Sequence, residues 1–488
     1  MSVLPSEEKE AAPSKQLTFG QAVVCLLLLI SMMIPGFVIL RIDTRVVFAL
    51  AALLPGTALV FFGFKKEEVL GWFIGGVANC AGLLMILMSV GIIIGTWIAS
   101  GVVPTFIYYG LTFLSPTTYL IVAFLTTCLV SFFIGSSFST LATMGVAFMG
   151  IGMGLGINPA ISGGMALSGA LFGDKLSPFS DTTHIAAAVS GVNVYRHINS
   201  MLYTTGPAFI ITCVLYIAHG MAAQQADMTI AIELMDAIRN NFNVTPVLFL
   251  VPVVTIVLIM LKLPPVLALV GSSIVAVIIG GIVQAGTIPF AIIVNSAGGG
   301  FSAQTGNPYL NTIVNRGGMI GMATVLIWTM IIMGIGDMMR RSGVINIFLS
   351  KILGKLKTPR HMALSTLAFS FVTACATASQ YLSLTIPGLL LKGEYDSRKI
   401  SRLVMSRSLE GGGTMFSFLI PWDSAALFAS AAIGVATLAY APYAYLLWIT
   451  PAFVVLYALI NKFMWMDEEG MDKVENEQLY LQQKKAKR

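Results

Sequence analysis

Long apolar runs separated by short polar segments make up most of the chain. Three of these runs, Ala22–Leu40, Val46–Phe64 and Val247–Leu261, approach or reach the roughly 17–25 residues with which a helix spans a bilayer. Other apolar stretches contain a central interruption of small, polar, glycine or proline residues. The pattern predicts an all-α polytopic membrane protein in which some helices are broken at membrane depth.

Composition supports this interpretation. Of the 488 residues, 57% are hydrophobic and 10% are charged, and the mean hydropathy is +0.87. A soluble domain has about 25% charged residues, so this chain has too few to cover a surface in water. The 47 glycines fit a membrane protein, in which they let helices approach closely. Five cysteines lie in apolar segments without metal or disulfide spacing, so neither is expected: Cys25, Cys80, Cys128, Cys213 and Cys375.

The chain contains an internal repeat. The tripeptide SGV at 100–102 returns at 342–344, and the same offset of 242 relates Ser137 to Ser379 and Asp181 to Asp423. Each unit has a long apolar helix, then an apolar stretch broken by hydroxyl residues, then a helix interrupted by a polar segment. A constant offset over about eighty residues predicts a structural duplication.

The two units have their interruptions at corresponding points. Long helices are predicted at Val69–Ala99 and Met319–Met339, hydroxyl-broken stretches at Tyr119–Gly150 (broken at Gly135–Thr140) and Met362–Leu391 (broken at Thr377–Ser379), and polar interruptions at Gly173–Thr183 and Gly411–Ser424. Broken helices at equivalent positions in two halves indicate the binding site of a transporter.

Lysine and arginine residues orient the two units. Basic residues bracket 362–391 on both sides, whereas the flanks of 119–150 are uncharged. By the positive-inside rule, 362–391 is predicted to be a re-entrant hairpin from the cytoplasm, and 119–150 one from outside. The repeats are therefore predicted to be inverted, with ten spanning segments, two hairpins and both termini inside. Asn158 and Gln225 would then be external, and Lys357 and Lys399 cytoplasmic.

The predicted organisation follows from these elements. It comprises a cytoplasmic N-terminal tail (1–18), a first transmembrane repeat (19–195), a connecting helix and external loop (196–243), an inverted second repeat (244–437), a last transmembrane helix (438–465) and a cytoplasmic C-terminal tail (466–488). The polar start carries no cleavable signal pattern, so the first helix is expected to be retained. The basic run Lys484–Arg488 is typical of a tail beside anionic lipid, and no nucleic-acid partner is expected.

Asp181 and Asp423 are the main candidates for chemistry, because a charge inside a bilayer is costly and usually functional. Each is followed by a hydroxyl residue, Thr182 or Ser424, and each is expected to face a hairpin tip that carries hydroxyl groups: Ser136, Ser137, Ser139 and Thr140 in the first unit, Thr377 and Ser379 in the second. Small hard cations prefer such oxygen ligands. Cation and proton would compete here, since one carboxylate cannot hold both. The alternative is that Asp181 only caps the helix Thr182–Ser190.

Other charged residues have two interpretations each. Asp174 either forms a local ion pair with Lys175 or belongs to the site. Glu410 either carries protons or pairs with Arg407 one turn earlier, and the pair is favoured. His184 can titrate near neutral pH, so it is either a proton relay or a simple hydrogen-bonding group. Asp337 precedes two arginines, Arg340 and Arg341, and is expected to be structural.

Two consecutive motifs carry a resemblance to a known family. The segments GALFGDKLSPFSDTTHIAAAVSG (169–191) and HINSMLYTTGPAF (197–209) resemble the signature of the NhaC-type Na+/H+ antiporters, which belong to a superfamily of inverted repeats with paired re-entrant hairpins. The resemblance implies site roles for five matching residues: Asp174, Ser177, Asp181, Thr182 and Thr183. The chain differs from the family at His184, where Asn is more usual.

The resemblance implies a secondary transporter of the bacterial inner (cytoplasmic) membrane that exchanges Na+ for H+. Some relatives couple this exchange to malate and lactate, so an organic-anion exchanger is the alternative. That alternative needs a positive group, and Lys175 is the one cation in the first interrupted segment, whereas the second has none. Expected partners are Na+, H+ and the lipid bilayer, with a small organic carboxylate and a second copy in a homodimer left open.

Other function classes lack their residues. The sequence has no P-loop, GxSxG or HExxH motif, so neither an ATP-driven pump nor a hydrolase is expected. No catalytic residue or cofactor is predicted. Inverted repeats with broken helices favour a carrier over a channel.

Overall fold

The computed structural model describes residues 15–39, 42, 44–223, 229–261, 263–353 and 358–465. These residues form helices and contain no β-strand. The predicted C-terminal tail, most of the predicted N-terminal tail, Gln225 and Lys357 lie outside the described residues.

The first half of the chain begins with a set of helices that precede the first hairpin: α1 (Phe19–Ile34) with its π-helical turn η1 (Pro35–Ile39), α2 (Thr44–Phe61), α3 (Lys66–Asn79), α4 (Ala81–Ala99) and α5 (Val102–Phe113). The first hairpin consists of α6 (Pro116–Ile134), α7 (Ser137–Thr140), the π-helical turn η2 (Leu141–Gly145) and α8 (Val146–Gly154). The interrupted helix follows as α9 (Pro159–Leu176) and α10 (Asp181–Ser190).

A connecting region leads to the second half: α11 (Val194–Ala222), α12 (Thr229–Asn241), the 3-10 turn η4 (Pro246–Phe249), α13 (Leu250–Met260), α14 (Pro265–Val283), α15 (Phe290–Gly299) and α16 (Pro308–Val314). The second half continues with α17 (Gly318–Gly321), α18 (Ala323–Arg341), α19 (Val344–Leu353), the hairpin α20 (Pro359–Thr377) and α21 (Gln380–Ser397), and the interrupted helix α22 (Arg402–Ser417) and α23 (Ser424–Ile433). The last elements are α24 (Thr437–Tyr440), η5 (Ala441–Tyr443) and α25 (Tyr445–Leu459).

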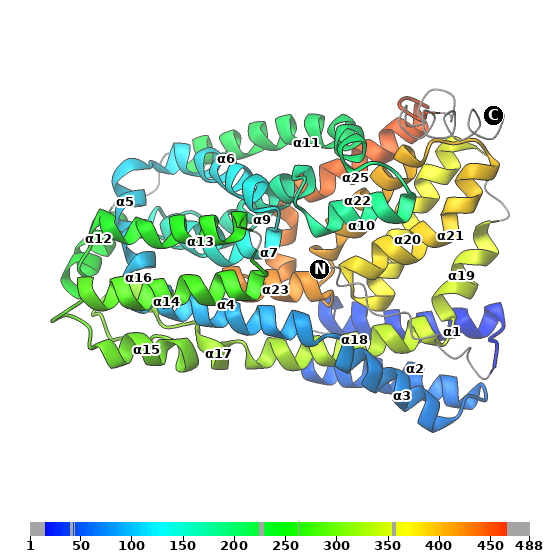
Figure 1. Cartoon of the computed structure of the whole chain (residues 1–488), viewed down its shortest axis with the longest axis horizontal. Helices are drawn as coiled ribbons and strands as arrows, with labels where there is room; N and C mark the ends of the chain where they lie inside the picture. The colour runs from blue at the N-terminus through cyan, green and yellow to red at the C-terminus, as the bar shows by residue number, and fades with distance from the viewer. Residues whose placement is uncertain are drawn as a thin grey trace, which may run out of the picture.

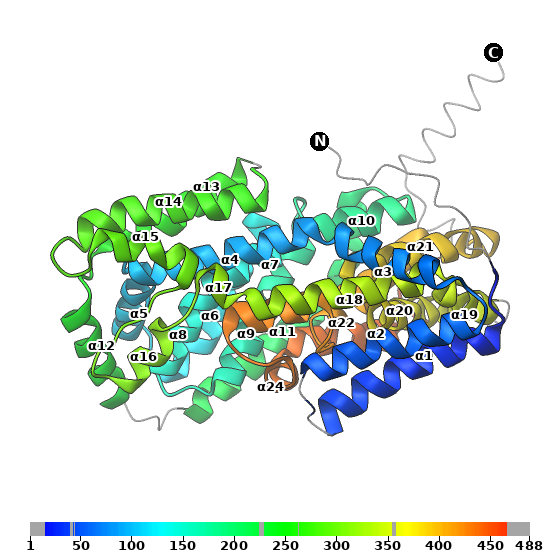
Figure 2. The same ribbon diagram turned by 90° about the horizontal axis from the view of Figure 1, so that it is seen from below.

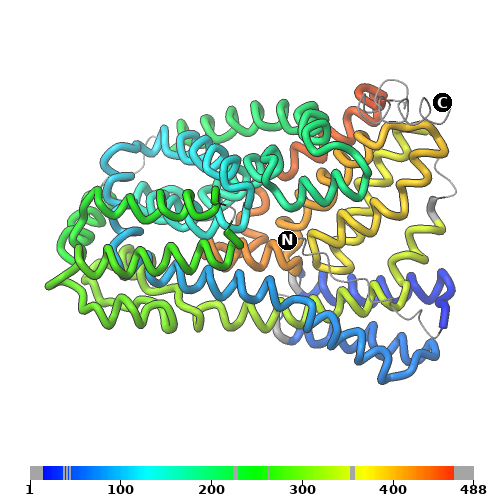
Figure 3. Tube along the Cα trace, viewed as in Figure 1, coloured from blue at the N-terminus to red at the C-terminus, as the bar shows by residue number. Residues whose placement is uncertain are grey.

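Most of these helices run along the long axis of the molecule, and the two hairpins occupy opposite halves of it (Figures 1 and 3). In Figure 1 the first hairpin lies on the left, in cyan, and the second on the right, in yellow. Seen from below, α13 to α15 lie at the left and α1, α2 and α19 at the right (Figure 2). Buried apolar residues correspondingly form two clusters, one around each hairpin.

The chain is an all-α, multi-pass membrane protein. Among the described helices, six are long and apolar enough to cross a membrane, and two bent pairs raise the number to eight. Two of the six belong to the first hairpin: α6, and the continuous stretch Ser137–Gly154. The number of spanning segments depends on where the membrane lies along the helices, so the predicted number of ten stays a prediction.

The structural repeat has two offsets rather than one. Left-handed Gly101 and Gly343 both precede a helix and lie 242 residues apart, as predicted. From the hairpins onward the offset is 243: it relates the starts of α6 and α20, the starts of α9 and α22, and the left-handed caps Gly191 and Gly434. One residue has been added between Val344 and Pro359, ahead of the hairpin, where a change of length is tolerated.

Close helix packing confirms the offset of 243. A Cβ atom on Gly169 of α9 would lie 2.8 Å from Thr127 Cβ and 3.0 Å from the Phe124 carbonyl oxygen of α6. The equivalent Gly412 of α22 faces the equivalent residues of α20: its Cβ would lie 2.5 Å from the Leu367 carbonyl oxygen and 3.0 Å from Ser370 Cβ. Glycine is therefore required at both positions by the approach of a neighbouring backbone.

The two units are packed across one another. After the break in its helix, α10 packs mainly on α21 and α22 of the second unit. Conversely, α23 packs on α7, η2 and α8 of the first hairpin, where the rings of Phe138 and Phe428 stack edge to face with centroids 4.6 Å apart. Each broken helix thus brings its second part to the hairpin of the other unit.

Candidate functional site

The first break lies at Ser177–Ser180. Helix α9 ends at Leu176 because the residue before a proline, here Ser177 before Pro178, is disfavoured in the helical conformation. Ser180 then caps α10, its Oγ accepting a hydrogen bond from the Thr183 nitrogen at 3.4 Å. The hairpin tip abuts this break, since a Cβ on left-handed Gly135 would lie 2.7 Å from Phe179 Cβ. The break is therefore held against the first hairpin.

The second break has the same construction. Helix α22 ends at Ser417, and Asp423 caps α23, with Oδ1 accepting from the Ala425 nitrogen at 2.9 Å. The hairpin tip again holds the break: Trp422 Nε1 donates to the Cys375 carbonyl at 2.9 Å, and the Ser424 nitrogen donates to the Ala378 carbonyl at 3.1 Å. The predicted interruption began too early, because Gly411–Gly413 are helical and serve close packing.

The offset of 243 changes which residues are equivalent. The predicted pairing of Asp181 with Asp423 is wrong by one residue: the partner of Asp423 is Ser180, and both cap their helices. The alternative interpretation, that Asp181 only caps its helix, is wrong as well, since Asp181 is the first residue inside α10 and is exposed. Ser379, predicted as the partner of Ser137, corresponds to Ser136, and both cap the second arm of their hairpin.

Each break combines one buried carboxylate with one buried serine, in exchanged positions. In the first unit the carboxylate is Asp174, near the end of α9, and the serine is the cap Ser180 beside it. In the second unit the serine is Ser417, equivalent to Asp174, and the carboxylate is the cap Asp423. Both units therefore hold the same pair of functional groups, on opposite sides of the break.

Asp174 contacts the first hairpin directly. Its Oδ2 accepts a hydrogen bond from the Ser137 nitrogen at 3.1 Å, at the start of α7. The hydroxyl of Ser137 has no partner among the described residues, although it is buried. Oxygen groups and a carboxylate thus converge at the tip of the first hairpin.

Asp423 is fully buried, and only one of its two carboxylate oxygens has hydrogen-bond partners among the described residues. Its Oδ1 receives the Ala425 nitrogen and, at 3.5 Å, the Ser424 hydroxyl. Within the described ranges, its Oδ2 and the neighbouring Ser417 hydroxyl have no hydrogen-bond partner. A buried, unpaired carboxylate oxygen is costly unless an ion or a proton occupies it.

The remaining predicted residues have more local partners. Ser177 Oγ accepts from the Phe179 nitrogen at 3.2 Å, Thr182 shares a hydrogen bond with the Ser180 hydroxyl at 3.1 Å, and Thr183 donates to the Lys175 carbonyl at 3.1 Å. His184 is exposed, with Nδ1 2.7 Å from the Ser180 carbonyl oxygen. Asp337 binds Arg340 at 2.6 Å and Arg341 at 2.7 Å, which confirms its structural role.

A second polar group consists of Lys175 on α9 and Glu410 on α22. Lys175 and Glu410 are fully buried and close enough to interact electrostatically, yet Nζ and both carboxyl oxygens lack hydrogen-bond partners in the described part of the chain. Neither of the two ion pairs that the sequence left open as alternatives is formed. Asp174 binds Ser137 instead of Lys175, and Arg407 donates to the Phe463 carbonyl at 2.9 Å and stacks on Trp465 instead of meeting Glu410.

Sequence reasoning missed two residues of the site and one pairing within it. Ser417 could have been found only with the offset of 243. His197, in the second motif, is fully buried, with Nδ1 2.9 Å from the Ser406 hydroxyl and Nε2 unpartnered among the described residues. The pairing of Lys175 with Glu410 joins residues 235 positions apart, so no local spacing reveals it.

The fold and the two broken helices define the class: a secondary membrane transporter built from two repeats. The chain belongs to the Na+/H+ antiporter family, whose model matches residues 169–462, more than half of the chain. The resemblance to NhaC-type antiporters is thereby confirmed.

Several named relatives match most of the chain. It is 34% identical over 415 residues to the malate-2H+/Na+-lactate antiporter of Bacillus subtilis, covering 85% of this chain and 88% of that protein. It is 33% identical over 456 residues to the Na+/H+ antiporter NhaC of Alkalihalophilus pseudofirmus, covering 92% and 96%. The Bacillus subtilis NhaC is 31% identical over 458 residues, covering 92% and 99%. All three of these relatives are named as antiporters.

Proposed function

We propose that this protein exchanges Na+ for H+ across the cytoplasmic membrane. The observation that carries the proposal is Asp423: a fully buried carboxylate beside the hydroxyls of Ser417 and Ser424, with one oxygen that has no hydrogen-bond partner among the described residues. Carboxylate and hydroxyl oxygens are the ligands that a small hard cation prefers. The NhaC relatives support Na+ and H+ as the ions exchanged.

Exchange follows because Na+ and H+ compete for the same buried carboxylate. A bare carboxylate is costly away from water, so it must be neutralised by a cation or by a proton. Binding of one ion therefore releases the other. Asp174, with Ser137 and Ser180, offers the equivalent groups in the first unit and is proposed as the second such carboxylate.

In this proposal, Asp181 and Thr182 lie at the edge of the site. Asp181 is exposed at the start of α10 and interacts electrostatically with Asp174. We assign it to ion entry, because an exposed carboxylate remains hydrated and carries little of the penalty that drives competition. Ser379 is assigned to positioning, since its hydroxyl caps α21.

Organic-anion exchange is the second candidate. It is favoured by the relative with 34% identity, whose name gives malate and lactate as substrates alongside H+ and Na+. In that case, the carboxylates would bind the coupling cations, and the organic anion would need a cationic group elsewhere.

The test is Na+-induced pH change in proteoliposomes that contain purified protein and an internal pH indicator. We expect Asp423→Asn to slow this change by roughly tenfold or more, since tenfold corresponds to only about 1.4 kcal/mol. The asparagine still caps α23, because Asn caps as well as Asp. Asp396→Asn, at an exposed ion pair with Arg402, is the matched control and should exchange normally. Normal exchange by Asp423→Asn would refute the site.

A further inference from the structure

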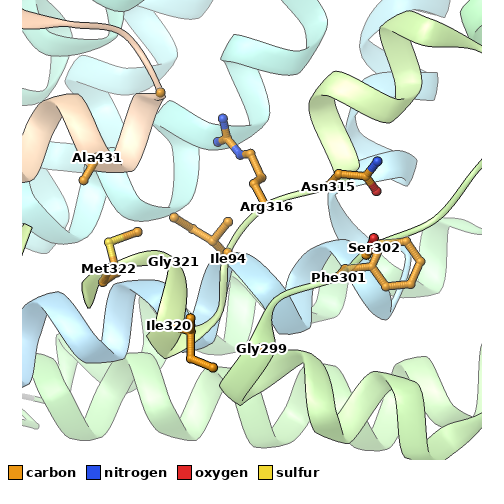
Figure 4. Close-up of a pocket in the computed structure, with 12 residues that line it drawn as sticks. Ile94, Gly299, Phe301, Ser302, Asn315, Arg316, Ile320, Gly321, Met322 and Ala431 are labelled. Carbon is orange, nitrogen blue, oxygen red and sulfur yellow. The ribbon is translucent and has the colours of Figure 1, made fainter. Parts of the chain in front are cut away.

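A cavity of about 440 Å³ lies outside the site described above (Figure 4). It is formed where the segment after α15 and the segment between α16 and α17 meet the end of α23. Its polar lining comes from Ser302, Asn315 and Arg316, and its apolar lining includes Ile94, Phe301 and Met322. Ser302, Asn315 and Gly434 are exposed, so the cavity opens to the surface.

The guanidinium of Arg316 places a positive charge in this cavity, and few acceptor groups of the described residues face it. The single hydrogen bond of its guanidinium to the described residues is from Nη2 to the Ala432 carbonyl, at 3.3 Å. No carboxylate among the described residues lies within 4 Å of it. Since a guanidinium has five N–H donors, most of its donors have no partner in the described part of the chain.

Capping of α23 accounts for only one of the five N–H groups of Arg316, the one that donates to the Ala432 carbonyl. A cation near a helix C-terminus is favourable, and Ala432 lies in the last turn of α23. However, Gly434 already closes this helix in the left-handed conformation, its nitrogen donating to the Ser430 carbonyl at 2.9 Å. The guanidinium instead fills the space that Gly434 leaves open, where a Cβ would lie 2.8 Å from Nη1.

The lining fits a small organic carboxylate. An arginine fork binds a carboxylate through two parallel hydrogen bonds. Asn315 accepts from the Ala303 nitrogen at 2.7 Å through Oδ1, which leaves its amide nitrogen to donate. Ser302 adds a hydroxyl, and the apolar residues suit a short carbon chain. The volume falls within the usual range of small-molecule sites, about 300–1,000 Å³.

We propose that this cavity, named here the Arg316 cavity, is the binding site for a small organic carboxylate. The proposal rests on the second candidate function above, and it supplies the cationic group that this function lacks. The Arg316 cavity and Asp423 lie at opposite ends of α23, about 15 Å apart for a helix of ten residues. One short helix therefore connects the proposed anion site with the proposed cation site.

The experiment measures binding of radiolabelled L-malate and L-lactate to the purified full-length protein in Na+ buffer. Wild type is expected to bind at least one of them, and Arg316→Gln to bind it roughly tenfold or more weakly, the effect of losing about 1.4 kcal/mol. Arg360→Gln, which removes an exposed guanidinium from α20, should bind as wild type does. Binding by Arg316→Gln equal to wild type would overturn the proposal.

A second measurement avoids any folding defect of the variant. Wild-type protein is treated with phenylglyoxal, which modifies guanidinium groups, and modification of Arg316 is followed by mass spectrometry. Malate or lactate should protect Arg316 selectively, and absence of protection contradicts the proposal. Equal protection by inorganic phosphate would indicate a general anion or lipid-headgroup site and would also overturn the carboxylate assignment.

Failure of the proposed function gives a different result. If wild type shows Na+-induced pH change in the absence of organic acids but binds neither malate nor lactate, this inference fails and Na+/H+ exchange stands. If wild type binds malate at Arg316 but shows no Na+-induced pH change under any condition, the proposed exchange fails and the anion site stands.

Discussion

At the scale of single residues, burial separates Asp174 from Asp181, although both belong to the same motif. Asp174 is buried and bonded to the hairpin tip, whereas Asp181 is exposed. We expect Asp174→Asn to slow Na+-induced pH change by roughly tenfold or more, a loss of about 1.4 kcal/mol, and Asp181→Asn to keep most of it. The measurement is the same proteoliposome assay with equal amounts of each variant. The reverse order of effects would move the site to the exposed start of α10.

Lys175 and Glu410 provide a second prediction at this scale. Removing one member of a buried charge pair leaves the other uncompensated, at a cost of about 3–5 kcal/mol, whereas replacing both by apolar residues is often neutral. We therefore expect Lys175→Met and Glu410→Leu each to lower the melting temperature strongly. The double variant should recover most of the loss. If the two losses simply add in the double variant, the two charges do not interact.

The sequence could identify the acids but not rank them. Asp174, Asp181 and Asp423 were all recognisable, because acids are rare in apolar segments. Their exposure depends on how α9, α10 and α23 pack against helices that are distant in the sequence, which no local pattern shows. Arg316 was missed for a similar reason: its cavity joins segments more than a hundred residues apart.

At the scale of the elements, the close approach of α22 to α20 gives a further prediction. A Cβ on Gly412 would lie 2.5 Å from a backbone oxygen, which cannot move freely. Gly412→Ala should therefore destabilise the protein by about 1–3 kcal/mol, the usual cost of overpacking, despite the better helix propensity of alanine. Gly393→Ala in α21 is the control, since beyond its own stretch of helix no atom of the described residues lies within 4 Å of its Cβ position. Thermal melting in detergent measures both, and an unchanged Gly412→Ala would contradict the packing.

The positions of the two hairpin tips were predictable from the sequence, and the offset between the units was not. The hairpin tips were expected at Gly135–Thr140 and Thr377–Ser379, and the chain breaks at Gly135–Ser136 and Ala378–Ser379. The matches at Ser137/Ser379 and Asp181/Asp423 were chance identities at an offset of 242. One added residue before the hairpin changes every later equivalence, although it leaves the local sequence patterns intact.

At the scale of the whole molecule, the opposite placement of the hairpins bears on membrane orientation (Figure 1). With the five native cysteines replaced, Asn158→Cys should react with an impermeant thiol reagent in intact cells. Lys399→Cys should react only after the membrane is opened, because basic residues mark the cytoplasmic side. Both positions are exposed in the structure, so burial does not decide the outcome. Labelling of both from outside would exclude the inverted arrangement.

The crossed packing of the two units has a consequence for biosynthesis. Helix α10 is complete at Ser190, but α21, on which it packs, begins only at Gln380. At roughly 5–20 residues per second, the ribosome needs about 10–40 s to make the intervening chain. During this interval the first unit is held in the membrane with one helix lacking its final neighbours. During this interval the first unit is therefore exposed to proteases and to misassembly. Its packing is complete only when the second unit has been made.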